Sequence, residues 1–170
     1  MLFRSLLAQG RRRIAVLGSA LPGALESPRI SGARQALVQQ GLAAVGVEHS
    51  GIASRSKARG YAAAQRLIAH ELPDAMFCVN DDVALGALAA VRDQGLSVPG
   101  DVAIAGFDNT DQTQFSSPRL TTVAVDLEAM AAVAVARLLA AVGAGPDHDR
   151  TGQAFLIPHQ LIPRASTVQD

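Results

Sequence analysis

The sequence predicts an α/β fold in which a parallel sheet is covered by helices on both faces. Short apolar runs alternate with segments of helical periodicity three times before a fourth apolar run. The runs are apolar throughout instead of alternating with polar residues, which is typical of parallel strands buried on both faces. The chain has 170 residues, 49% of them apolar, which is enough for one well-buried core.

The first part of the chain supplies the elements of this sheet. Glycine and proline residues mark the ends of these segments. They separate strands predicted at 14–18, 45–51, 75–79 and 102–107 from helices predicted at 27–41, 57–73 and 81–95. Ser27 is a suitable N-cap for the first helix, with Pro28 in its first turn. Asp81 or Asp82 can cap the third helix in the same way.

The pattern changes after residue 107. A polar loop is predicted at 108–120, an extended segment at 121–125, a helix at 127–142 and a last extended stretch at 154–163. The helix at 127–142 is apolar around most of its circumference, so it needs cover on several sides. Nothing else in the chain is suited to cover it, and we expect a partner segment from upstream sequence or from another subunit.

Composition excludes several classes of function. Fifteen basic and fifteen acidic residues give a formal net charge of zero, so the chain has no general basic field for nucleic acid. Cys78 is the single cysteine and the four histidines lack ligand spacing, so we expect no metal and no cofactor. The strand-end carboxylates could hold Mg²⁺, but no phosphate-binding loop, nucleophile elbow or placed base accompanies them, and we expect no enzyme. Neither a secretory signal nor a membrane span is present, which favours the cytoplasm.

Polar side chains stand where the predicted strands end. Arg29 lies early in the helix after the first strand, Asn80 closes the third strand, and Asp108 closes the fourth. The carboxyl ends of parallel strands edge one crevice, so these residues can hold a small polyhydroxylated or purine-like ligand. Each also has a structural interpretation: Asn80 and Asp108 as turn residues, and Arg29 as a surface charge.

Three stretches carry a resemblance to a known family. FCVNDDVALGALAAVRDQGLSVPGDVAIAGFDNTD, SSPRLTTVAVDLEAMAAVAVARLL and LIPHQLIPRAST stand in the order and spacing of the lac repressor and galactose repressor family of bacterial transcription regulators. The chain resembles this family from about Gly10 to Thr167. The resemblance implies a two-lobed effector domain built like the periplasmic sugar-binding proteins.

The resemblance also implies a division of the chain. Residues 10–120 would form the C-terminal lobe, residues 121–158 a crossover segment of an incomplete N-terminal lobe, and residues 159–167 the return strand. The rest of the N-terminal lobe and the DNA-binding headpiece would then lie outside this sequence, which we expect to be N-terminally truncated. The uncovered helix at 127–142 would pack in that N-terminal lobe.

The family pattern assigns effector contacts to Arg29, Asn80 and Asp108, with Asp81 as a neighbour. Two positions depart from it: Val125 stands where a glutamine is frequent, and the surroundings of Arg55 are polar where an aromatic ring is frequent. Both departures bear on which small ligand, sugar-like or less hydroxylated, is recognised.

The implied function is effector sensing by a transcriptional repressor. Effector binding between the lobes would shift their orientation, and a homodimer would contact operator DNA through the absent headpieces. The alternative is the solute-binding protein of a sugar transporter, which shares the two-lobed architecture. The upstream genomic sequence distinguishes the two, because one requires a helix-turn-helix and the other a secretory signal.

Overall fold

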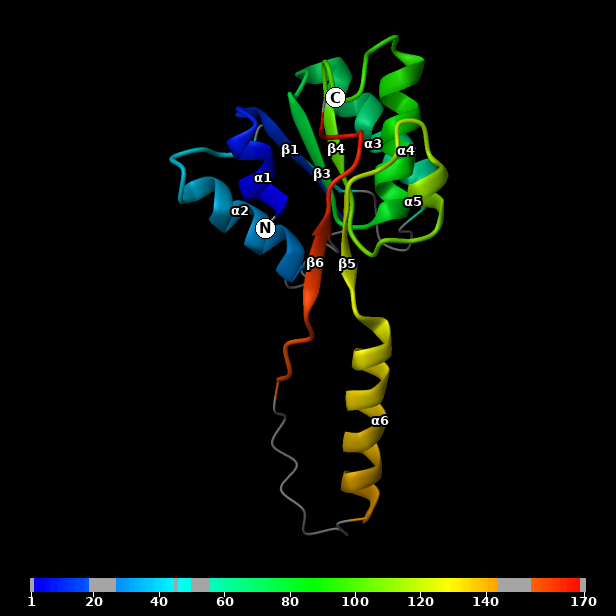
Figure 1. Ribbon diagram of the computed structural model, residues 1–170. Helices are drawn as coiled ribbons and strands as arrows, with labels where there is room; N and C mark the ends of the chain where they lie inside the picture. The colour runs from blue at the N-terminus through cyan, green and yellow to red at the C-terminus, as the bar shows by residue number, and fades with distance from the viewer. Residues whose placement is uncertain (1, 19–26, 45, 50–55, 144–153, 169–170) are drawn as a thin grey trace.

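A four-stranded parallel sheet forms the centre of the molecule (Figure 1). The computed structural model describes residues 2–18, 27–44, 46–49, 56–143 and 154–168. The strands are β1 (Ile14–Gly18), β2 (Val47–His49), β3 (Ala75–Cys78) and β4 (Ala103–Ala105), in the spatial order β2-β1-β3-β4. Every pairing in this sheet is parallel, as the apolar runs predicted.

Helices cover both faces of this sheet. On one face lie α1 (Leu2–Ala8) and α2 (Pro28–Val38), and on the other α3 (Lys57–His70) and α4 (Asp81–Asp93). All residues of β1, β3 and β4 are buried. Alternate side chains along each strand point to opposite faces of the sheet and pack into two separate hydrophobic clusters. The predicted fold class is therefore confirmed.

Helix α1 extends the packed unit beyond the predicted lobe boundary at residue 10. Its four buried side chains share one hydrophobic cluster with β1 and α2; they are Leu2, Phe3, Leu6 and Leu7. The ring of Phe3 lies edge-on to the ring of Phe77 in β3, with 5.0 Å between centroids. Residues before the first strand thus complete one face of the sheet.

One of the two predicted helix caps is wrong. Ser27 is the N-cap residue of α2 with Pro28 in the first turn, as predicted, although its side chain makes no capping hydrogen bond. Helix α4 is capped by Asn80, whose side chain accepts a hydrogen bond from the backbone N–H of Val83, and not by Asp81 or Asp82. The two aspartates are the first two residues of the helix, where negative charge complements the helix dipole.

A two-stranded antiparallel ribbon, β5 (Thr122–Val125) with β6 (His159–Ile162), leaves the carboxyl end of the sheet (Figure 1). Helix α6 (Leu127–Gly143) stands beyond it, away from the sheet, and none of its residues is buried. The predicted helix is confirmed, and its apolar side chains are uncovered by the described part of the chain. The polar loop predicted at 108–120 contains a short helix that was not predicted, α5 (Gln112–Phe115).

The chain after β6 returns to the sheet. The backbone N–H of Ile104 in β4 donates to the carbonyl of Ser166, and the Ser166 hydroxyl donates to the carbonyl of Ile104 at 2.6 Å. Ser166 Oγ also accepts the backbone N–H of Thr121, just before β5. The ribbon is therefore anchored at its base by buried hydrogen bonds.

Among the described helices, none has the length and hydropathy to cross a bilayer.

Candidate functional site

The strand order places a topological switch between β1 and β3. Strand β1 connects through α2 to β2 on one side, and β3 leads to β4 on the other. In open parallel sheets, ligands bind in the crevice outside the carboxyl ends of the strands at such a switch. Arg29, in the first turn of α2, lies at this end of the sheet.

Arg29 is held by three separate interactions. Its Nη1 donates to the carbonyl oxygen of Val79 at 2.6 Å, and its Nη2 donates to Asp108 Oδ1 at 3.2 Å. The guanidinium carbon lies 3.8 Å from the centroid of the Phe107 ring, a cation–π contact. About a third of each charged side chain stays exposed, 34% for Arg29 and 37% for Asp108, so both are accessible to a ligand.

The loop after β4 presents Asp108 in an uncommon backbone conformation. Asp108 has φ +113° and Asn109 has φ +54°, both in the region that favours glycine. The ribbon holds this conformation, because the N–H of Asp108 donates to the carbonyl of Val123 and the N–H of Asn109 donates to Thr122 Oγ1. Strained residues of this kind concentrate at ligand sites, where the surrounding structure determines them.

A hollow of about 580 Å³ opens beside Arg29. Its wall comes from α1, α2, β3, the loop after β4, the ribbon and the segment before β6. The lining residues are Leu2, Phe3, Pro28, Arg29, Gly32, Ala33, Ala36, Phe77, Phe107, Val123, Leu156 and His159. Most of these are apolar, and Arg29 and His159 are its titratable members. A mostly apolar wall with a few placed polar groups is the usual composition of a small-molecule site.

The three predicted contacts are only partly brought together. Arg29 and Asp108 form a direct ion pair. Asn80 follows Val79, the residue whose carbonyl holds Arg29, but its own side-chain oxygen is occupied by the cap of α4 and the residue is only 5% exposed. Asn80 does not line the hollow. Its position at the strand end was predicted, while the direction of its side chain was decided by the helix.

Asp81 connects helix α4 to the ribbon. It is fully buried, and its two oxygens accept hydrogen bonds from the Thr122 hydroxyl at 2.6 Å and the Thr110 backbone N–H at 2.8 Å. Burial raises the pKa of this carboxyl and the charge of Asp108 adds to the rise, while the bonds from Thr122 and Thr110 oppose it. Asp81 therefore fastens the loop that carries Asp108.

Val125, another predicted neighbour, does not line the hollow beside Arg29. Val125 is half-buried in β5, paired in register with His159, and it lines a second, smaller cavity of about 260 Å³. His159 lines both cavities, so it connects the position of Val125 with the hollow beside Arg29. Arg55 lies outside the described residues.

Sequence reasoning missed Phe107 and His159. Phe107 precedes Asp108 in the stretch GFD, so an aromatic residue next to a strand-end aspartate was the available signal. His159 had no local signal, because its place in the hollow depends on the antiparallel register of β6 with β5.

Known proteins give a consistent comparison. The sequence profile of the periplasmic binding protein-like domain matches residues 3–167. The transcriptional regulator DegA of Bacillus subtilis is 33% identical over 166 residues, 96% of this chain and 48% of DegA. The transcriptional repressor CytR of Escherichia coli K12 is 39% identical over 120 residues, 70% of this chain and 35% of CytR.

Solved structures agree with these relatives. A putative LacI-family regulator from Sanguibacter keddieii superposes with a TM-score of 0.85 at 32% identity, covering 98% of this chain and 63% of that one. The lac repressor dimer bound to operator and an anti-inducer gives a TM-score of 0.84 at 25% identity, covering 98% and 48%. The chain spans about half or less of the curated relatives described above. It belongs to the periplasmic binding protein-like domain family and, within it, to the effector domains of lac repressor and galactose repressor regulators.

Proposed function

We propose that this chain is the effector-sensing part of a DNA-binding transcription regulator, and that a small polar ligand contacts Arg29 and Asp108. The observation that carries the proposal is their ion pair beside a hollow of about 580 Å³ at the switch point of the sheet. Asn80 contributes by fixing the start of α4, and with it the strand end whose Val79 carbonyl holds Arg29.

The chemistry of the pair suits a ligand that both donates and accepts. The Arg29 guanidinium offers a planar fork of donors and Asp108 offers carboxylate acceptors, which together match a vicinal diol or the edge of a purine. The Phe107 ring and the apolar wall suit the flat face of such a molecule. A sugar or a nucleoside fits this description.

Regulation would follow from the ribbon. Strands β5 and β6 leave the lobe next to Asp108 and lead to α6, so a ligand on Arg29 and Asp108 acts at their base. We propose that binding changes how a second lobe sits against this one, and that a homodimer passes the change to operator DNA in the cytoplasm. The matched relatives are named as transcriptional regulators, a non-enzymatic class, which supports this function over solute transport.

The test is a ligand panel measured on the purified chain by thermal shift and calorimetry. The panel contains hexoses, pentoses, nucleosides and free purines. We expect a saturable response to one of these classes, and its loss in both Arg29→Ala and Asp108→Ala. Removing one partner of a desolvated, charged hydrogen bond weakens binding by about 2–5 kcal/mol.

The control variant is Arg4→Gln, which removes an exposed arginine from α1. It must bind as the unaltered chain does. A ligand whose affinity survives both Arg29→Ala and Asp108→Ala would place the effector site elsewhere. A regulator containing this chain that still responded to its effector with both substitutions in place would refute the assignment in cells.

A further inference from the structure

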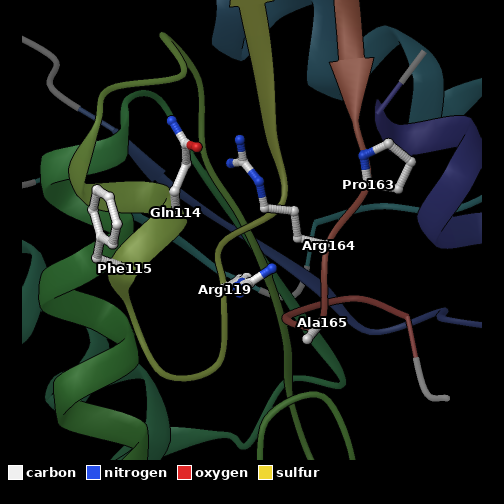
Figure 2. A pocket seen from close by; sticks show the side chains of 6 residues that line it. All are labelled: Gln114, Phe115, Arg119, Pro163, Arg164 and Ala165. Atoms are coloured by element: carbon white, nitrogen blue, oxygen red, sulfur yellow. The ribbon is translucent and has the colours of Figure 1, made fainter.

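A second hollow, of about 610 Å³, lies on the other side of the ribbon base from the lobe helices α1 and α2. Figure 2 shows its wall: Gln114 and Phe115 come from α5, Arg119 from the loop after α5, and Arg164 from the chain that follows β6. Pro163 and Ala165 complete it. None of these residues belongs to the candidate effector site.

Arg164 is held rigidly at this hollow. Its Nη1 donates to Thr113 Oγ1 at 2.9 Å and to the carbonyl of Leu120 at 2.8 Å, and its Nη2 donates to Asn109 Oδ1 at 2.8 Å. These partners are neutral, so the three hydrogen bonds orient the guanidinium without cancelling its charge. A pre-oriented guanidinium loses little freedom when it binds a further group.

Among the described residues, those that line the hollow include two arginines and no carboxylate. Arg119 and Arg164 both line it, and within the described residues the Arg119 guanidinium has neither a hydrogen bond nor an ion pair. Burial lowers the pKa of Arg164, and the neighbouring charge of Arg119 lowers it further, against the opposing effect of Asp81. The two cations therefore repel one another across a space that an anion would stabilise.

Phe115 gives the same hollow an apolar edge. Phe115 is 85% exposed, although Thr113 in the same helix, α5, is fully buried. Gln114 beside it offers both a donor and an acceptor. An aromatic ring next to paired guanidinium groups suits a ligand with a flat apolar part and a charged head.

We propose that this hollow binds a small organic anion, with its carboxylate or phosphate head between Arg119 and Arg164 and its flat apolar part against Phe115. The site is separate from the hollow beside Arg29 and does not rest on the function proposed for it. The two are nevertheless connected, because Arg164 donates to Asn109, the residue after Asp108. A ligand on Arg164 would thus act on a side chain that is hydrogen-bonded to the loop presenting Asp108.

The test uses the full 170-residue chain and four probes: phenyl phosphate, benzoate, inorganic phosphate and neutral benzamide. Binding is measured by calorimetry and by chemical-shift titration at constant ionic strength. We expect saturable binding of phenyl phosphate or benzoate, weaker binding of inorganic phosphate, and none of benzamide. Arg119→Gln, which alters an exposed side chain, should weaken binding about tenfold, as expected for loss of one charged hydrogen bond.

Two controls separate this site from general charge effects. Arg4→Gln removes the same charge from α1 and should leave the affinity unchanged, while Phe115→Ala should weaken the aromatic anions but not inorganic phosphate. Equal losses in Arg4→Gln and Arg119→Gln would overturn the proposal. So would the absence of saturable binding by every probe at millimolar concentration, or a binding that disappears as the protein concentration rises, which would show that a second copy fills the hollow.

Discussion

Replacing Asn80 with alanine tests whether this residue acts as a helix cap or as a ligand contact. Its side-chain oxygen accepts the Val83 backbone N–H at 2.9 Å, and both residues are buried. Losing an N-cap costs about 1 kcal/mol, and up to about 2 kcal/mol in folded proteins. Water cannot reach the Val83 N–H to replace the lost acceptor, so we expect a cost near the upper figure, about 2 kcal/mol.

Urea unfolding followed by far-ultraviolet circular dichroism measures this cost. With a slope of about 2 kcal/mol per molar urea, the midpoint should fall by about 1 M and the slope should stay unchanged. Asn80→Ser keeps an acceptor at the cap and should recover most of the loss.

Asp82→Ala is the matched control in the same turn. Asp82 is half-exposed and 3.5 Å from Lys57 Nζ, and such surface pairs contribute about 0.5 kcal/mol. If Asn80→Ala leaves the midpoint where it was, or costs less than Asp82→Ala, then the cap is not needed and the reasoning fails. The amide of Asn80 would in that case be available to a ligand.

Three further predictions concern packing and charge. Gly86→Ala should destabilise the protein by about 1–3 kcal/mol, because a Cβ there meets the backbone of α3. Gly32→Ala in α2, where a Cβ meets nothing within 4 Å, should instead stabilise it by about 0.5–1 kcal/mol. The urea midpoints of the two variants check this, and equal effects would contradict it. The pKa of Asp81 is raised in the folded state, so the contribution of this group to stability is greatest below the ordinary carboxyl pKa of about 4. That contribution is lost as the pH rises through the raised pKa. Asp81→Asn should flatten this part of the stability–pH profile, and an unchanged profile would show that Asp81 is not its source. A double-mutant cycle of Arg29→Ala with Asp108→Ala should give a coupling free energy of about 0.5–1 kcal/mol, since both groups remain about one third exposed; a coupling of zero in low salt would mean that the pair is not formed in solution.

The comparison of sequence and structure separates local from nonlocal information. Continuous apolar runs and their glycine and proline boundaries predicted the four strands of the sheet, α2, α3, α4 and α6, because these signals depend on neighbouring residues. The same signals missed α5, a helix of four residues without an apolar period, and they assigned the cap of α4 to the wrong side chain. Several neighbouring polar residues can cap one helix, and packing selects among them.

The candidate site shows the same division between local and nonlocal information. Arg29 and Asp108 were predicted from their places after parallel strands, because parallel strands bring their carboxyl ends to one edge whatever the details of packing. That their charges form an ion pair over the ring of Phe107 depended on the strained loop at Asp108 and on the ribbon that holds it. The second hollow was invisible in the sequence, since Arg119 and Arg164 lie 45 positions apart (164 minus 119) and meet only where the chain returns to the sheet. Local periodicity and turn chemistry were therefore sufficient for the longer elements of the chain and their sequence, whereas the direction of the polar side chains at the site was decided by contacts between residues far apart in the chain.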